Sequence, residues 1–169
     1  MEASTENEPT SEKYHTSSER KSDRELVVTR TFNAPARIVF EAWTKPELFK
    51  RWWTPKSFGM TILSCEQDVR VGGGYRLVIS HPAAPAPMEF FGQYLEVIPH
   101  ERLVWTNEEG GEDGQVTTVT FEEKAGKTLL VMHDLYATKE ALDEAISSGA
   151  TSGAGETFDQ LDATLATLS

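Results

Sequence analysis

The stretch "RTFNAPARIVFEAWTKPELFKRWW", residues 30–53, passes from strand-like to helical periodicity and decides the fold. Upstream of the change, β-branched residues in partial alternation predict a strand over 24–32. Pro35 suits the first turn of a helix, because its missing N–H needs no partner there. The dipeptide Lys45-Pro46 ends this helix and allows a second to begin. The ordered part of the chain is therefore predicted to start with one strand and two short helices.

After Gly59 the apolar period changes to that of strands. Short stretches rich in Gly, Pro, Asn, Asp or Lys separate the segments, as expected for turns. The predicted strands are residues 60–67, 75–80, 88–98, 101–108, 115–123 and 127–135. Strands in series with short links favour an antiparallel meander. Together with 24–32, they predict a sheet of about seven strands.

Helical spacing returns near the C-terminus. Thr138 can cap a short helix, and a second, amphipathic helix is predicted from Ser152 to Leu168 because Phe158, Leu161 and Leu165 share one face. An antiparallel sheet must have one face covered, and this last helix is the long amphipathic element that the chain offers. We therefore expect an α+β fold in which a curved sheet wraps around the C-terminal helix, with a pocket between them.

Composition narrows the function. The formal net charge of −11 disfavours nucleic acid and anionic membrane surfaces as partners. A single cysteine, Cys65, excludes an internal disulfide, and no apolar run is long enough to insert into a membrane. The first residues lack a secretory signal, so a cytoplasmic protein is expected. Residues 1–23 are almost wholly polar and are predicted to be a disordered tail before a single domain at 24–169.

Five stretches, taken in order, resemble a known family. They are "RTFNAPARIVFEAWTKPELFKRWW", "DVRVGGGYRL", "FGQYLEVIPHERLVWT", "VTFEEKAGKTLLVMH" and "GETFDQLDATL", which lie between residues 24 and 168. The chain resembles the SRPBCC superfamily, with its START-like helix-grip fold, and within it the family named for activators of the heat-shock-protein-90 ATPase. The resemblance implies a helix-grip fold. Relatives bind hydrophobic small molecules, cyclise polyketides or assist chaperones, and no shared catalytic triad can be carried over.

The candidate site is the pocket between the sheet and the last helix. Adjacent tryptophans at 52 and 53 are interpreted as a packing anchor, with Trp53 also placed at the pocket rim beside the loop that follows it. The predicted lining consists of large apolar residues and one histidine: Trp53, Phe58, Leu77, Ile79, Phe90, Tyr94, Trp105, His133, Phe158, Leu161 and Leu165.

His133 is the main candidate acid–base group; Glu66 and Glu89 are alternative inward carboxylates, although such residues more often lie on the solvated convex face. If Leu129, Val131 and Leu135 face inward, then so does His133, because strand side chains alternate. An inward histidine would serve as a general base or a polar anchor, although a histidine satisfied near the sheet end is the favoured alternative. No histidine or cysteine pair has metal-ligand spacing, and no catalytic or cofactor motif is present, so no metal or cofactor is expected.

Three functions remain open. The first is a binding protein for a hydrophobic, aromatic or lipid-like small molecule, acting as a monomer or weak homodimer. The second is a co-chaperone that activates the heat-shock-protein-90 ATPase in a stress response, as the family name suggests. The third is a cyclase or hydratase that uses the same pocket with His133 or a glutamate as its acid–base group.

Overall fold

The computed structural model describes residues 15–108, 114–148 and 153–168, and it contains one eight-stranded antiparallel sheet. The strand order is β2-β3-β9-β8-β7-β6-β5-β4. The strands are β2 (Ser17–Arg20), β3 (Glu25–Phe32), β4 (Thr61–Gln67), β5 (Gly74–Ser80), β6 (Met88–Ile98), β7 (Arg102–Asn107), β8 (Gln115–Lys124) and β9 (Lys127–Leu135). The predicted α+β helix-grip fold is confirmed.

The α-helices occupy the predicted places, and a short 3-10 helix that is not predicted from the sequence follows the second of them. They are α1 (Ala36–Thr44), α2 (Pro46–Phe49), the short 3-10 helix η1 (Lys56–Phe58), α3 (Lys139–Ser147) and α4 (Ala154–Ala166). Lys45 is extended and separates α1 from α2, as its position before a proline predicts. Thr138 caps α3 by accepting a hydrogen bond from the Ala141 N–H at 3.0 Å.

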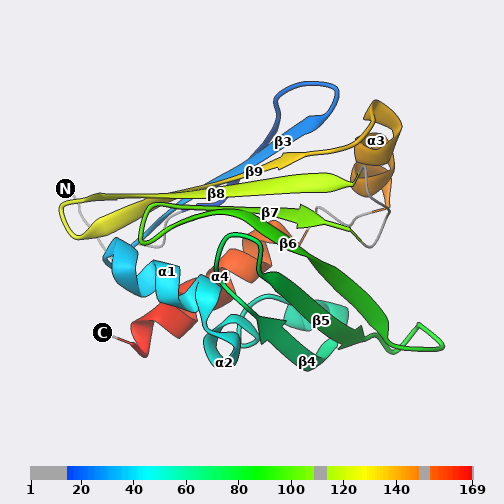
Figure 1. Cartoon of the computed structure of the whole chain (residues 1–169), viewed down its shortest axis with the longest axis horizontal. Coiled ribbons are helices and arrows are strands. Elements are labelled where there is room, and N and C mark those ends of the chain that lie inside the picture. Colours follow the sequence, from blue (N-terminus) through cyan, green and yellow to red (C-terminus); the bar gives the residue numbers. More distant parts are fainter. Residues whose placement is uncertain (1–14, 109–113, 149–152, 169) are drawn as a thin grey trace, which may run out of the picture.

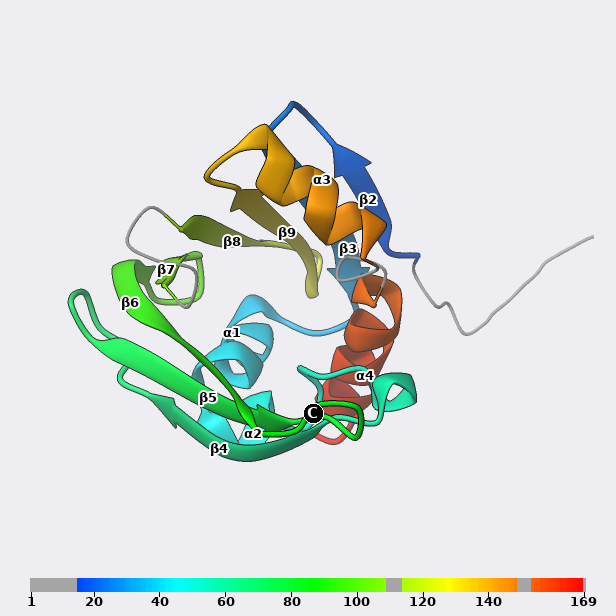
Figure 2. The same cartoon turned by 90° about the vertical axis from the view of Figure 1, so that its right-hand side faces the viewer.

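The sheet curves strongly, and the helices α1, α2 and α4 lie on its concave side (Figures 1 and 2). Viewed in Figure 2, the strands β2 and β3 form one end of the curve and β4 and β5 the other, while α4 runs beside the opening between them. In Figure 1, α1 and α2 lie toward one end of this arrangement. A sheet that curves around a single helix leaves space on its concave side, and that space contains the site.

Trp52 is the centre of the packing at the α1–α2 end. Its ring is fully buried, and its Nε1 donates a hydrogen bond to the Ala42 carbonyl at 3.0 Å. It meets the ring of Trp43 edge-on, with the centroids 4.8 Å apart. Trp53, its neighbour in the chain, is only half-buried. The two tryptophans therefore differ in environment, one within the core and one at its margin.

An ion pair attaches α4 to the sheet. Arg30 of β3 has a side chain only 1% exposed, and its Nη1 lies 2.6 Å from Asp159 Oδ1 of α4. Its Nη2 is 3.5 Å from Asp162 Oδ2, one turn along the same helix. Asp159 and Asp162 stay 51% and 34% exposed while they contact this arginine, whose inward position a strand pattern alone does not reveal.

The strand β2 is the main departure from the sequence-based expectation. It lies within the segment expected to be a disordered tail, yet it pairs with β3 from Ser17 opposite Thr29 to Arg20 opposite Leu26. All four β2 residues are exposed, so backbone hydrogen bonds hold the strand without apolar burial. Arg20 adds an ion pair to Asp143 of α3 at 2.7 Å. Composition indicates how much apolar surface a segment can bury, so it does not predict a strand without apolar burial. Residues 1–14 of the expected tail lie outside the described residues.

Candidate ligand-binding cavity

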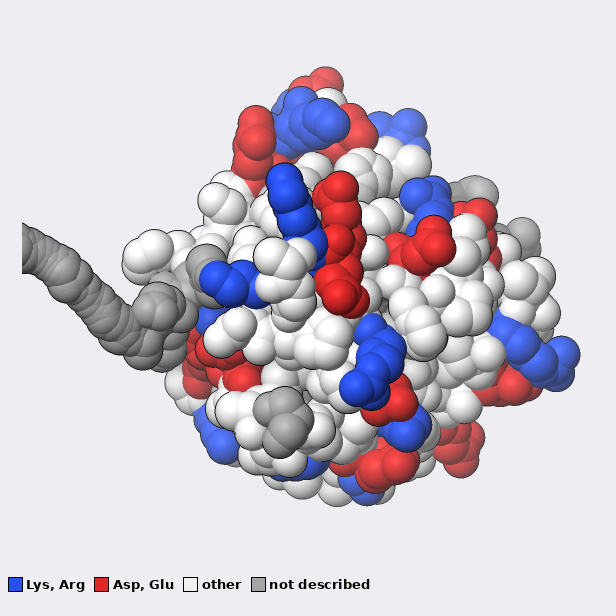
Figure 3. Space-filling view, turned by 90° about the vertical axis from the view of Figure 1, so that its left-hand side faces the viewer, with Lys and Arg blue, Asp and Glu red and all other residues white. Residues whose placement is uncertain are grey.

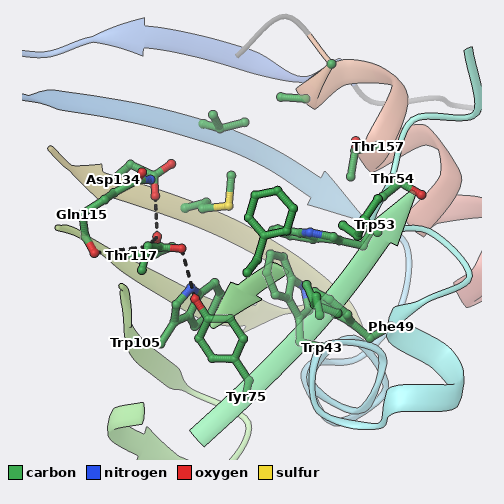
Figure 4. Close-up of a pocket in the computed structure, with 18 of the residues that line it drawn as sticks. Trp43, Phe49, Trp53, Thr54, Tyr75, Trp105, Gln115, Thr117, Asp134 and Thr157 are labelled. Atoms are coloured by element: carbon green, nitrogen blue, oxygen red, sulfur yellow. Dashed lines mark hydrogen bonds between the residues drawn. The ribbon is translucent and has the colours of Figure 1, made fainter. Parts of the chain in front are cut away.

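A cavity of about 380 Å³ lies between the concave face of the sheet, α4 and the segment 53–60 (Figure 4). Its wall is mainly aromatic and aliphatic: Leu26, Val28, Trp43, Phe49, Trp53, Pro55, Phe58, Met60, Tyr75, Leu77, Ile79, Phe90, Tyr94, Trp105, Met132, Tyr136, Gly153, Ala154 and Phe158. Its polar members are Thr54, Gln67, Asn107, Gln115, Thr117, Asp134 and Thr157.

Most of the lining predicted from the sequence faces this cavity. The residues placed there are Trp53, Phe58, Leu77, Ile79, Phe90, Tyr94, Trp105 and Phe158. Leu161 and Leu165 do not line it; they are 0% and 3% exposed and pack into the solid core. The cavity therefore lies beside the first turns of α4, while the later turns of the helix are used for packing.

His133 was placed on the wrong face of the sheet. The buried residues of β9 include Leu130 and Asp134, whereas Leu129 is 37% exposed, so the inward phase is the even-numbered one. His133 points to the outer face, where its Nε2 lies 2.7 Å from Glu25 Oε2. The alternative of a satisfied histidine fits this geometry. The sequence 129–135 has apolar residues in both phases, so alternation alone could not choose between them.

The inward phase instead brings a carboxyl group to the cavity. Asp134 is 7% exposed, and its Oδ1 accepts a hydrogen bond from Thr117 Oγ1 at 2.6 Å. Thr117 Oγ1 in turn accepts one from Asn107 Nδ2 at 2.9 Å. Burial raises the pKa of Asp134, although hydrogen bonds from the side chains of Thr117 and Gln115 oppose the rise. Asn107, Gln115, Thr117 and Asp134 are called the polar end of the cavity below.

The opposite side of the cavity is an aromatic end, made of Trp43, Phe49, Trp53, Phe58 and Phe158. Figure 4 shows Trp43, Phe49 and Trp53 on one side of the view and Asp134, Gln115 and Thr117 on the other. Trp53 stacks on Phe49 with centroids 4.7 Å apart and meets Trp43 edge-on at 5.8 Å. Such geometries are favourable for aromatic pairs and hold the rings in fixed orientations.

Tyrosine hydroxyls complete the polar part of the lining. Burial raises the pKa of Tyr94 and of Tyr136 to about 12, so both phenols stay neutral. The Tyr94 hydroxyl receives a hydrogen bond from Gln67 Nε2 at 3.3 Å. Tyr75 donates its hydroxyl proton to the Thr106 carbonyl at 2.8 Å. Among the described residues that line the cavity, Asp134 is the one acid, and none is Lys, Arg or His.

The segment that carries part of the aromatic end is clasped to α4. Glu156 accepts hydrogen bonds from the backbone N–H of Ser57 at 2.9 Å and from its hydroxyl at 2.5 Å. Gln160 Oε1 accepts from the Lys56 N–H at 2.9 Å, and its Nε2 donates to the carbonyl oxygens of Trp52 and Thr54. These bonds fix Trp53 and Phe58 against the cavity.

Gly153 allows α4 to approach this segment. A Cβ at position 153 would lie 2.7 Å from Pro55 Cγ, a distance that real Cβ contacts do not show. A larger residue there would push η1 and the start of α4 apart. The glycine is thus a requirement of the cavity wall.

Other chemistry has little support at this site. Burial raises the pKa of the Cys65 thiol to about 11, and Cys65 is not among the cavity-lining residues. Within 15–108, 114–148 and 153–168, no group of three or more His, Cys, Asp or Glu side chains could hold a metal ion. In the same ranges, no helix is long and apolar enough to cross a membrane.

The surface shows no concentration of one charge on the face drawn in Figure 3, where basic and acidic side chains are interspersed among uncharged areas. Nucleic-acid binding would call for a continuous basic area.

Comparison with known proteins adds a family. The model of the family described as "Activator of Hsp90 ATPase homolog 1-like protein" matches residues 33–166. A protein of Rhodobacter sphaeroides has a similar structure, with a TM-score of 0.82, 25% identity, and coverage of 91% of this chain and 99% of that one. A protein of Staphylococcus epidermidis is also similar, with a TM-score of 0.73 and 28% identity. The match covers 89% of this chain and 94% of that one.

A third solved structure, an AHSA1-like protein of Aeromonas hydrophila, has a TM-score of 0.63 and 18% identity, with coverage of 84% of this chain and 93% of that one. At that identity the likeness concerns the fold alone. No functionally curated protein matches the chain.

Proposed function

The chain belongs to the Activator of Hsp90 ATPase homolog 1-like family, and we propose that this member binds a hydrophobic, aromatic small molecule in the cavity between its sheet and α4. The observation that carries the proposal is the cavity itself. Its volume of about 380 Å³ lies in the range of small-molecule sites, and its wall is mainly aromatic and aliphatic with a few grouped polar side chains.

Packing supports this proposal over a purely structural role. Interiors are normally filled to high density, and empty apolar space costs stability in proportion to its volume. The aromatic rings around this cavity are held by mutual contacts, so they do not collapse into it. A cavity maintained at such a cost is expected where a ligand occupies it.

The other two functions have less support. An enzyme with His133 as its general base has less support, because His133 lies outside the cavity and pairs with Glu25 on the outer face. The chaperone-directed function in the family's name has no particular surface in its favour among the described residues. We assign the proposed binding to the cytoplasm, where an unpaired cysteine such as Cys65 is usual.

Titration with prodan, an uncharged fluorescent dye without a hydrogen-bond donor, tests the proposal. The parent protein should shift the emission of the dye to shorter wavelength and saturate. Leu77→Trp, which adds volume inside the cavity, should weaken binding by about tenfold or more, since it displaces the ring of the dye. Leu95→Trp is the matched control, because Leu95 is 50% exposed on β6.

Equal dye binding by the parent and Leu77→Trp would contradict the cavity as the binding site, as would no dye binding by the parent. If Leu77→Trp does not fold, Phe90→Trp adds less volume at a half-buried lining position and serves the same purpose.

A further inference from the structure

We infer that the cavity selects ligands that present an uncharged or cationic hydrogen-bond donor, a hydroxyl or an amino group, to Asp134, and that it disfavours anionic ligands. This inference rests on the proposed function and names the chemical class of its ligand.

Asp134 occupies a position that packing alone would give to an apolar residue. Its inward neighbours along β9 are Leu130 and Met132, and its own side chain is 7% exposed. Burying a carboxylate is costly unless it is paired, and the cavity lining contains no basic side chain among the described residues. A residue so placed weakens the fold, which is typical of groups kept for binding or catalysis.

The hydrogen bonds around Asp134 leave an acceptor facing the ligand. Asn107 Nδ2 donates to the Gln115 carbonyl at 3.2 Å and to Thr117 Oγ1 at 2.9 Å, which commits both of its protons. Thr117 therefore donates its own proton to Asp134. A carboxylate offers about four lone-pair positions, and the protein fills only part of that capacity, through Thr117 and Gln115.

Two donors near the polar end are already used within the protein. The Tyr75 hydroxyl donates to the Thr106 carbonyl, and Gln67 Nε2 donates to the Trp43 carbonyl at 3.0 Å and to the Tyr94 hydroxyl. An anionic head group binds best to a cation, and the described residues that line the cavity supply none. Such a group would find only neutral donors here, for instance the Tyr136 hydroxyl. It would also meet the like charge of Asp134 in a region of low dielectric.

The rings beside the polar end favour the same class. Trp105 and Tyr75 lie next to Thr117 in Figure 4, and both line the cavity. Aromatic faces attract cations and accept weakly from N–H and O–H groups. A donor at Asp134 would therefore lie against electron-rich rings while the rest of the ligand fills the aromatic end.

Competition against bound prodan tests the inference with compounds that share one ring system: naphthalene, naphthylmethanol, naphthylmethylamine and naphthoate. In the parent, the alcohol or the amine should compete about tenfold better than naphthalene, the size expected for one hydrogen bond to a charged acceptor. Naphthoate should compete worst. A preference for the amine identifies a cationic ligand, and equal competition by amine and alcohol identifies a hydroxyl-bearing one; both support the inference.

Variants assign the selectivity to one carboxyl group. Asp134→Leu should remove the advantage of the alcohol and amine while prodan still binds. Glu25→Gln is the matched control: Glu25 lies on the outer face of the neighbouring strand β3, and its replacement should leave the order of the competing ligands unchanged. Should Asp134→Leu fail to fold, Asp134→Asn retains the shape and should still lower the amine's advantage.

The outcomes separate the two proposals. If the parent does not bind prodan, the proposed function fails. If prodan binds but naphthoate competes as well as the alcohol and amine, or Asp134→Leu and Asp134→Asn keep the parent's order, the inference about ligand class is wrong while the proposed function stands.

Discussion

The two ends of the cavity differ in how they are built. The aromatic end comes from α1, α2, the segment that includes η1, and α4, and its rings pack on one another. The polar end comes from the strands β7, β8 and β9, and hydrogen bonds connect its side chains. Packing that stabilises the fold thus dominates at one end, and at the other a buried carboxyl group opposes it. Stability and ligand choice are assigned to different ends.

The largest expected effect concerns the aromatic end, where substitutions of Trp52 and Trp53 should have different consequences. Trp52→Ala should lower the free energy of unfolding by about 3–5 kcal/mol, because the ring is fully buried and its Nε1 is hydrogen-bonded. Trp53→Ala should cost clearly less, since Trp53 is half-buried, and should weaken prodan binding instead. Thermal melts and dye titrations on both variants measure this. A more destabilising Trp53→Ala would make the pair a packing anchor only.

The second prediction concerns the polar end, where Asp134→Asn should raise the melting temperature near neutral pH by a few degrees. Asparagine keeps an oxygen that accepts from Thr117 and removes a charge that burial disfavours. A fall in melting temperature for this variant would show that the carboxylate stabilises the fold and would remove the contrast between the two ends.

The pH dependence of stability sharpens the same point. Because the pKa of Asp134 is raised above its ordinary 3.8, its ionisation destabilises the folded state. This cost is absent below 3.8 and grows as pH rises through the raised folded pKa. The gain from Asp134→Asn should therefore shrink on acidification. Tyr136, which lies beside Asp134, has a pKa of about 12 and does not titrate in this range.

Glu25 is the control for that measurement, since its pKa shifts in the other direction. Hydrogen bonds from His133 and Ser22 lower its pKa below the ordinary 4.5, so its contribution to stability is present above that value and is lost as pH falls. Unfolding curves of Glu25→Gln and Asp134→Asn over the acid range should diverge in opposite senses. Parallel curves would contradict the assignment of Asp134 as a buried, destabilising group.

The smallest expected effect is on the rate of ligand release. It concerns the hydrogen bonds between Glu156 of α4 and Ser57 at the aromatic end. Glu156→Gln should leave the melting temperature nearly unchanged, because the group is exposed, and should speed dye exchange by loosening the Ser57 contacts. Stopped-flow release of prodan measures it. Unchanged release rates would show that ligands do not pass by the segment 53–59.

The two ends of the cavity also differ in how far they can be predicted from the sequence. Large aromatic residues are usually buried, so residue type and periodicity predict four of the lining residues: Trp53, Phe58, Phe90 and Trp105. Polar residues in strands are normally expected to face water, so the sequence pattern does not predict Thr117 and Asp134 in the cavity. In β9, apolar residues on both faces concealed the phase, and His133 was placed inward where Asp134 lies. An error of one residue in the inward phase of β9 thus exchanges His133 and Asp134.

The fold is easier to predict from the sequence than the site, because turns and helix starts have local sequence signals. Pro35, Pro46 and Thr138 mark helix boundaries that the structure contains. The sequence does not predict β2, because all four of its residues are exposed and a strand without apolar burial leaves no hydrophobic pattern. Long-range contacts, such as Gly153 against Pro55, depend on the assembled structure and have no local sequence marker.

The most direct test of the central claim is a crystal structure of the protein with naphthylmethanol. We expect the ring system between the aromatic residues near Trp53 and the hydroxyl oxygen within about 3 Å of Asp134. A ligand bound outside the cavity would contradict the proposed function. A ligand inside it whose hydroxyl points away from Asp134 would contradict the division of the cavity into an end for packing and an end for selection.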